Sequence, residues 1–128
     1  MSTTEQAMFR YLVDDVAAAV GFYTAHLGFT VDLDASPAFA SVSRGPLRLL
    51  LSGPKSSAGR PMADGATPEP GGWNRFQLHV EDIDAEVEHL RKEGVTFRND
   101  VLSGPGGKQV LLVDPAGNFV ELFQPAAR

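Results

Sequence analysis

The chain offers few side chains that could take part in chemistry, and a histidine is the clearest of them. Cysteine is absent from the 128 residues, which excludes disulfides, thiolate metal sites and a cysteine nucleophile. His79 follows Gln77 in an alternating segment, so it could donate a hydrogen bond to a ligand or shuttle a proton. A core or pocket-rim histidine with a satisfied hydrogen bond is an equally good interpretation. His26 and His89 fall in helical segments, where solvent exposure is expected, and no set of nucleophile, base and orienting residue can be identified.

Aromatic side chains form a second group of chemical interest, because a flat ligand can stack on them. Trp73 stands where a Gly- and Pro-rich stretch meets a strand-like segment, a better position for contacting a ligand than for anchoring a core. Phe39 and Phe119 lie in segments that are expected to form strands. The sequence GPGGK at 104–108 lacks the spacing and the Ser or Thr of a phosphate-binding loop, so we interpret it as a hairpin turn.

The composition is that of an ordinary globular protein and excludes several classes of function. Hydrophobic residues make up 43% of the chain and charged residues 21%. A net charge of -5 without any Lys/Arg cluster argues against binding to nucleic acid. The sequence shows neither a signal-peptide pattern nor an apolar run of membrane-spanning length. We therefore expect a cytoplasmic protein that binds neither nucleic acid nor membrane.

The two halves of the chain repeat one pattern. Aligning Asp15 with Asp82 brings apolar residues into register: Phe9 with Phe76, Val13 with Val80, Val16 with Ile83 and Val20 with Val87. Each copy begins as an alternating strand and continues as an amphipathic helix. The candidate helix caps are Asp14 or Asp15 and Asp82 or Asp84, and the candidate left-handed helix ends are Gly28 and Gly94.

Further strands follow each helix, so each copy is expected to be a β-α-β-β-β unit. The expected strands cover residues 29–33, 38–43 and 47–52 in the first copy, and 95–98, 108–113 and 119–124 in the second. Residues 53–72 are rich in Gly, Pro, Ser and Ala and are expected to be a linker. We predict an α+β fold in a single domain over residues 1–128, with modules at about 7–52 and 73–125.

Alternation along the first strand of each copy separates a face under the helix from a face that could meet a ligand. The more uniformly apolar set, expected under the helix, is Phe9, Tyr11 and Val13 in the first copy and Phe76, Leu78 and Val80 in the second. The opposite face then carries Met8, Arg10 and Leu12 in the first copy and Arg75, Gln77 and His79 in the second. Two sheets with such faces could line a shared concave site.

Two β-α-β-β-β units in one short chain resemble the vicinal oxygen chelate superfamily, the glyoxalase/bleomycin-resistance group. The segments DVAAAVGFYTAHLGF at 15–29 and DPAGNFVELFQP at 114–125 carry the resemblance, which extends over nearly the whole chain. It implies two modules whose curved mixed sheets enclose a cavity, commonly completed in a homodimer. The long linker leaves pairing of the modules within one chain as the alternative.

The resemblance also implies four positions for metal ligands, of which this sequence keeps one. The positions fall on Met8, Arg75, Glu121 and Leu49, or Leu50 after a slip of one residue. Leucine offers no donor, a thioether is a poor ligand for hard or borderline dications, and a guanidinium cannot deprotonate. Our hypothesis is that an Arg75–Glu121 ion pair replaces the metal, and the alternative role for Glu121 is that of a catalytic base. No metal and no cofactor are expected.

The missing ligands favour the bleomycin-resistance branch, in which a metal-independent protein sequesters a small natural product. We expect a partly aromatic ligand such as an antibiotic. The alternative is an enzyme of the same superfamily, a lyase, epimerase or dioxygenase that uses a metal or, without one, Glu121 or His79. No catalytic residue is assigned. The expected ligand-binding residues are Met8, Leu12, Phe39, Leu49, Leu51, Trp73, Arg75, His79, Phe119 and Glu121.

Overall fold

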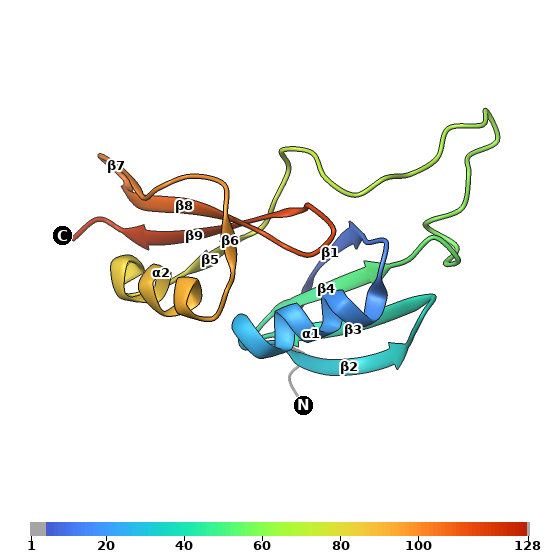
Figure 1. Ribbon diagram of the computed structural model, residues 1–128, viewed down its shortest axis with the longest axis horizontal. Helices are drawn as coiled ribbons and strands as arrows, with labels where there is room; N and C mark the ends of the chain where they lie inside the picture. The colour runs from blue at the N-terminus through green and yellow to red at the C-terminus, as the bar shows by residue number, and fades with distance from the viewer. Residues whose placement is uncertain (1–4, 128) are drawn as a thin grey trace. The chain divides into compact units, whose positions relative to one another are not determined.

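The computed structural model describes residues 5–127 and divides the chain into two compact units. Unit 1 ends at Gly71 and unit 2 begins at Gly72. Each unit has one helix and one mixed sheet of its own (Figure 1). The prediction of an α+β fold built from two β-α-β-β-β modules is confirmed.

Unit 1 follows the expected strand and helix order. Its elements are β1 (Ala7–Leu12), α1 (Val16–His26), β2 (Thr30–Ala35), β3 (Phe39–Arg44) and β4 (Leu47–Ser52). The strands lie in the order β1-β4-β3-β2, with β1 parallel to β4 and the other neighbours antiparallel. The helix between β1 and β2 covers one face of this sheet (Figure 1).

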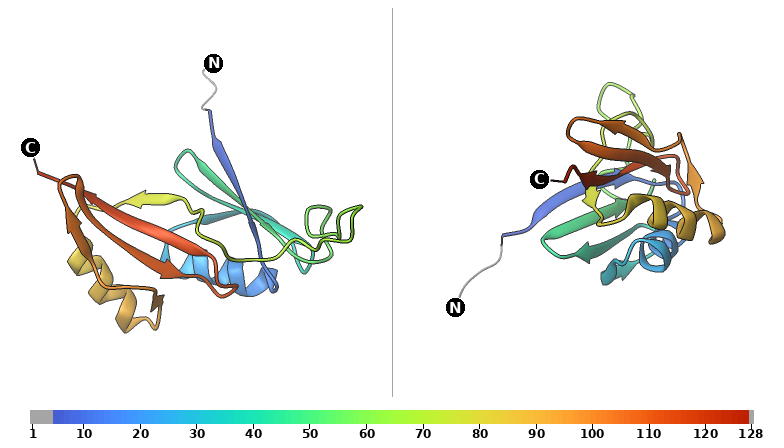
Figure 2. Two further views of the ribbon diagram at one scale, coloured as in Figure 1. Left: turned by 90° about the horizontal axis from the view of Figure 1, so that it is seen from above. Right: turned by 90° about the vertical axis from the view of Figure 1, so that its left-hand side faces the viewer.

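Unit 2 repeats the plan with one additional short strand. Its elements are β5 (Gln77–His79), α2 (Ile83–Lys92), β6 (Thr96–Phe97), β7 (Leu102–Gly104), β8 (Gly107–Val113) and β9 (Phe119–Pro125). The order is β5-β9-β8-β6, β7 also pairs with β8, and β5 is parallel to β9. Figure 2 shows α2 along one side of this sheet, so that no helix of unit 2 covers the other side.

The helix ends are those that the sequence indicates. Of each pair of candidate caps, Asp15 and Asp82 are the ones used, and their Oδ1 atoms accept from the main-chain nitrogens three residues later at 3.0 and 3.1 Å. Gly28 and Gly94, just past the helices, have φ angles of 70° and 87°, which favour glycine over other residues. The two helices therefore start and stop by the same local chemistry.

Each core lies between the helix and the apolar face of its sheet. In unit 1 the buried set includes Tyr11, Val13, Val16, Ala19, Tyr23, Leu49 and Leu51, whereas Phe9 is half-buried. In unit 2 it includes Phe76, Leu78, Ile83, Val87, Leu90, Val110, Leu112, Val120 and Leu122. The alternation predicted for the first strand of each copy is thus confirmed for Tyr11, Val13, Phe76 and Leu78, whereas Val80, like Phe9, is half-buried.

The strand that follows the helix differs between the units, and here the prediction was wrong. The expected strand 95–98 is only β6, and β7 was not expected. Between them the chain leaves the regular ladder: the Arg98 nitrogen donates to the Leu111 carbonyl at 2.8 Å, and the Asn99 side chain accepts from the Leu111 nitrogen at 2.9 Å. Because a side-chain amide supplies an acceptor that the main chain supplies in a regular strand, pairing is interrupted and resumes at β7.

Residues 53–76 form neither helix nor strand and connect the sheets of the two units (Figure 1). The beginning of this segment is nevertheless ordered by a buried serine. Ser56 Oγ donates to the Gly53 carbonyl at 2.7 Å and accepts from the Gly59 nitrogen at 3.1 Å. Within residues 5–127, no helix has the length and apolar character needed to cross a membrane.

Candidate functional site

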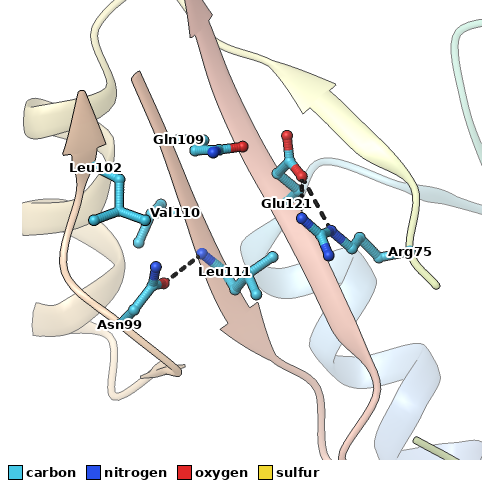
Figure 3. Close-up of a pocket in the computed structure, with 7 residues that line it drawn as sticks. All are labelled: Arg75, Asn99, Leu102, Gln109, Val110, Leu111 and Glu121. Atoms are coloured by element: carbon cyan, nitrogen blue, oxygen red, sulfur yellow. Dashed lines mark hydrogen bonds and ion pairs between the residues drawn. The ribbon is translucent and has the colours of Figure 1, made fainter. Parts of the chain in front are cut away.

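The face of unit 2 opposite α2 carries a buried carboxylate whose two oxygens are both engaged. Glu121 on β9 is 7% exposed. Its Oε1 accepts from Arg75 Nε at 3.0 Å and from Nη2 at 2.9 Å, and its Oε2 accepts from Gln77 Nε2 at 2.6 Å. Figure 3 shows the Arg75 guanidinium directed at this carboxylate. The Arg75–Glu121 ion pair predicted from the sequence is confirmed.

Strand register explains why these side chains meet. Gln77 lies directly opposite Glu121 in the parallel β5–β9 pair, so the two side chains project on the same face. Arg75 precedes Gln77 by two residues and reaches the same carboxylate. Its Nη1 also donates to the main-chain carbonyl of Trp73 at 3.2 Å. This bond holds the guanidinium against the segment that precedes β5. The arginine is thus fixed from two sides.

His79 extends the hydrogen-bonded series along β5. Its Nε2 lies 2.8 Å from Gln77 Oε1, and its ring centroid lies 5.4 Å from that of Phe123. The residue is exposed. The resulting series, which we call the β5 relay, comprises Arg75, Glu121, Gln77 and His79.

Aromatic residues gather at the start of unit 2. Trp73 is 62% exposed, which agrees with its expected place outside the core. Its ring centroid lies 5.1 Å from that of Phe119, and the guanidinium carbon of Arg98 lies 5.9 Å from the Trp73 centroid. Such an arrangement leaves a large aromatic surface available for stacking and places a cation beside it.

A hollow of about 90 Å³ adjoins the ion pair. It is lined by Arg75, Asn99, Leu102, Gln109, Val110, Leu111 and Glu121 (Figure 3). Ligand pockets for drug-sized molecules are about 300–1,000 Å³, so this hollow holds only a part of such a ligand. Sequence reasoning named Arg75 and Glu121 of these residues and missed the other five, Asn99, Leu102, Gln109, Val110 and Leu111. Gln109 and Leu111 could have been predicted, because they lie two residues apart on the same face of an expected strand, whereas Asn99 and Leu102 depend on the interrupted strand and had no signal.

The face of unit 1 opposite α1 holds three of the expected site residues. Met8 is 59% exposed, and Leu12 and Phe39 are half-buried. Leu12 and Phe39 both pair with Ser52 of β4, from its two sides, so they share a face. Arg10 is the polar residue of this strand face, and its Nη1 donates to Ser52 Oγ at 2.8 Å.

Leu49 and Leu51 do not lie on that face, which corrects our expectation. Both have an exposed fraction of 0% and pair with Phe9 and Tyr11, the residues of the α1 face. Leu50 instead pairs with Arg10, as Glu121 pairs with Gln77. The counterpart of Glu121 in unit 1 is therefore Leu50, the position one residue along. Because side chains alternate with a period of two, a slip of one residue moves a side chain to the other face of the sheet.

Comparison with known proteins identifies the family. The Glyoxalase/Bleomycin resistance protein/Dioxygenase superfamily model matches residues 6–122, so the chain belongs to this superfamily. No curated protein sequence matches the chain.

Among solved structures, similar folds include an enzyme and two antibiotic-binding proteins. Lactoylglutathione lyase from Agrobacterium tumefaciens is 23% identical with a TM-score of 0.73, over 97% of this chain and 96% of that chain, and shows the fold alone. TnmS3, an antibiotic binding protein from Streptomyces sp. CB03234, is 26% identical with a TM-score of 0.72, over 98% and 99%. The bleomycin-binding protein from bleomycin-producing Streptomyces verticillus, complexed with copper(II)-bleomycin, is 27% identical with a TM-score of 0.66, over 98% and 100%.

The residues of this chain do not fit the metal centre that the superfamily resemblance implies. Its four positions hold Met8, Leu50, Arg75 and Glu121 once the register is corrected. Glu121 is the one hard donor among them, and both of its oxygens already accept hydrogen bonds within the protein. Over the part of the chain that the structure describes, no three His, Asp or Glu side chains lie close enough together to hold a metal ion.

Proposed function

We propose that this protein binds a small, partly aromatic natural product of the antibiotic type, without a metal and without changing it chemically. The observation that carries the proposal is the engagement of Glu121 by Arg75 and Gln77. A general base has to come within about 2.6–3.2 Å of the atom that carries the proton it removes. At Glu121 those positions are taken by the protein's own donors, which favours a structural role over catalysis.

The exposed aromatic surface supports an aromatic ligand. Trp73 and Phe119 form a tilted pair with Arg98 beside the indole, so a flat molecule could stack on the free part of the Trp73 ring. Two of the similar structures are antibiotic-binding proteins, which makes this ligand class a reasonable one for the present chain. The proposed contacts are Met8, Leu12, Phe39, Trp73, Arg75, His79, Phe119 and Glu121.

The small volume beside Glu121 bears on the assembly. A hollow of about 90 Å³ needs a further surface if a drug-sized ligand is to be enclosed. We propose that a homodimer provides it, as the superfamily resemblance implies, with pairing of the modules within one chain as the alternative. Native mass spectrometry tests the homodimer, because it reports the mass of the assembly with any bound ligand or metal, and a ligand-bound monomer would favour pairing within one chain.

The test of function combines binding, metal content and recovery of the probe. Purified protein is titrated with metal-free bleomycin, a mitomycin and an enediyne by isothermal calorimetry, and each probe is then recovered and analysed by mass spectrometry. We expect saturable binding of at least one probe, its recovery unchanged, and a metal content far below one per chain. A Trp73→Ala variant should bind that probe more weakly.

The enzyme alternative makes the opposite prediction for the same experiment. One stoichiometric, tightly held metal together with conversion of a probe that a chelator abolishes would establish a metal-dependent enzyme. Conversion that persists with the chelator and disappears in Glu121→Gln would establish the metal-free enzyme. Absence of binding to all three probes would overturn the sequestration proposal for these antibiotic classes.

A further inference from the structure

The β5 relay carries an inference about ligand chemistry. We infer that Gln77 fixes the tautomer of neutral His79 with the proton on Nε2, so that Nδ1 is presented as a hydrogen-bond acceptor. The ligand class that this selects is one with an O–H or N–H donor, such as a phenol, placed at His79. The inference rests on the proposed function for its ligand and deepens it, whereas the tautomer itself is a property of the free protein.

The first step is the orientation of the Gln77 amide. Glu121 is paired with a guanidinium, and a carboxylate offers only acceptors to its neighbours. A Gln77 atom lies 2.6 Å from Glu121 Oε2. If the amide were turned by half a rotation, its oxygen would face the carboxylate oxygen and the two acceptors would repel each other. The amide nitrogen therefore faces Glu121. The nitrogen and oxygen of an amide have nearly the same shape, so it is the charge of the carboxylate that decides between the two orientations.

The second step transfers this orientation to the imidazole. With its nitrogen turned to Glu121, Gln77 points its carbonyl oxygen at His79 Nε2, 2.8 Å away. An amide oxygen only accepts, so Nε2 has to carry the proton. Neutral imidazole has a single N–H, and Nδ1 is then left with a lone pair. The carboxylate of Glu121 thus sets, through the Gln77 amide, which nitrogen of His79 can accept.

The third step concerns access to this acceptor. His79 is exposed, and its Nδ1 has no hydrogen-bond partner among residues 5–127. Contact with the Phe123 ring supports the imidazole from one side. His79 also lines an open hollow of about 480 Å³ together with Val80, Glu81, Gln124, Pro125 and Ala127. This volume is within the range of small-molecule sites, and the carboxylate of Glu81 at its margin also suits a donor-bearing ligand.

The tautomer is tested by long-range ¹H–¹⁵N correlation spectra of ¹⁵N-histidine-labelled protein at about pH 8.5, well above the ordinary pKa of histidine. We expect His79 to show the Nε2–H form alone, with an Nε2 proton that exchanges more slowly than that of exposed His89, whose Nε2 lies 3.5 Å from Glu93 Oε2. Gln77→Leu should remove the protection. In Glu121→Gln the second amide no longer dictates how Gln77 is turned, so Nδ1–H signal should appear at His79. An unchanged His79 spectrum in both variants would overturn the relay.

The ligand class is tested with two matched probes, phenol and anisole, which differ by the donor. Binding is followed by the His79 ring shifts in wild type and by affinity in His79→Phe, which keeps an aromatic ring and removes the acceptor. Loss of one hydrogen bond predicts phenol binding that is weaker by about 2- to 10-fold in His79→Phe, with anisole unchanged. Equal effects on both probes, or no shift of His79 with phenol, would overturn the ligand class.

The proposed function and the His79 tautomer can be disproved independently. A fixed Nε2–H tautomer in a protein that binds none of the natural-product probes would overturn the proposed function and leave the relay intact. Natural-product binding in a protein whose His79 tautomer ignores Gln77 and Glu121 would do the reverse.

Discussion

Units 1 and 2 place their first and last strands side by side in the same register, yet the faces turned away from the helices carry different chemistry. In unit 2 the face holds the β5 relay of Arg75, Gln77, His79 and Glu121. The residues in the same register positions of unit 1 are Met8, Arg10, Leu12 and Leu50. The carboxylate of Glu121 in unit 2 thus corresponds in register to Leu50 in unit 1, and His79 corresponds to Leu12.

The faces under the helices show no such difference. Leu49 and Leu51 of β4 correspond in register to Val120 and Leu122 of β9, and each of the four is at most 1% exposed. Burial against a helix requires an apolar side chain, because an unpaired polar group there costs several kcal/mol, on the order of 2–7. The opposite face tolerates polar groups, but only if they find partners. Glu121 can occupy its buried place because Arg75 and Gln77 accompany it.

The largest expected effect is a loss of stability on replacing Arg75 of unit 2 by methionine, the residue at the corresponding position of unit 1. Arg75→Met introduces the side-chain type of Met8 and leaves Glu121, 7% exposed, without its cation. Breaking a buried pair by removing one partner typically costs 3–5 kcal/mol, and because the Arg75 side chain is 31% exposed we expect the lower end, about 3 kcal/mol. The free energy of unfolding in urea measures this loss.

The matched control is the double variant Arg75→Met/Glu121→Leu, which reproduces the Met8 and Leu50 combination of unit 1. Because no charge is then left buried, most of the lost stability should return, as it does when buried ion pairs are replaced by apolar groups. If the double variant is as unstable as the sum of the two single variants, the difference between the units does not arise from charge pairing.

The second effect concerns the strand after the helix, which is a single strand with one register shift in unit 1 and is divided into β6 and β7 in unit 2. Asn99→Ala removes the acceptor of the Leu111 nitrogen, and a buried donor left unsatisfied costs about 1–3 kcal/mol. We expect about 1–2 kcal/mol and faster hydrogen exchange at the Leu111 amide. Asn99→Asp keeps an acceptor at the same place and should retain the protection. Equal exchange rates in wild type and Asn99→Ala would show that this bond does not hold the interruption together.

A smaller, equal effect is expected at the two helix caps, where the units are most alike. Asp15→Ala and Asp82→Ala each remove one acceptor from the first helical turn, at a cost of about 1 kcal/mol. Helix α2 has Asp84 and Glu86 in its first turn, whereas α1 has no acidic residue there, so the loss at Asp15 should be at least as large. Thermal unfolding of the two variants checks this. A much larger loss at Asp82 would contradict the equivalence of the caps.

How far the sequence could predict the fold depended on whether a feature is local. The caps and the glycines after the helices each depend on a few neighbouring residues, and the sequence predicted them. The turn Asp114–Asn118 between β8 and β9 is of the same local kind. Asp114 Oδ1 accepts from the nitrogens of Ala116 and Asn118 at 2.9 and 2.8 Å, a pattern that the side chain itself creates. The interruption between β6 and β7 could not be predicted, because it depends on Asn99 meeting Leu111 across the sheet.

The candidate site shows the same division. The Arg75–Glu121 pair was predictable, because the superfamily resemblance places both residues at the ligand positions of one metal site. The position of Leu49 was not, because register between β1 and β4 is a property of two strands about 40 residues apart, and alternation alone leaves a shift of one residue undecided. Gln77 was placed on the correct face, but its role as the link to His79 required the atoms of the amide.

The smallest effect is expected at the C-terminal end of β2, where Ser36 and Asp34 form a polar turn in unit 1. Ser36 donates to Asp34 Oδ1 through its hydroxyl at 2.5 Å and its main-chain nitrogen at 3.0 Å. The hydroxyl first, and the main-chain bond second, lower the pKa of Asp34 below its ordinary value of 3.8. Ala35 pairs with Phe39 in unit 1 as Leu102 pairs with Gln109 in unit 2, so Ala35 corresponds to Leu102. The residue before each of them is Asp34 in unit 1 and Val101 in unit 2.

A lowered pKa in the folded chain means that the charged form of Asp34 favours folding. This contribution is present above 3.8 and is lost as the pH falls through the folded-state pKa of Asp34. Ser36→Ala removes the hydroxyl and keeps the main-chain donor, so the pKa of Asp34 should rise toward 3.8 without fully reaching it. A ¹³C titration of the Asp34 carboxyl in both proteins measures the change. Since the carboxyl is exposed to solvent, stability at neutral pH should hardly respond, and a large loss there would mean that the end of β2 supports unit 1 by packing and not by this hydrogen bond.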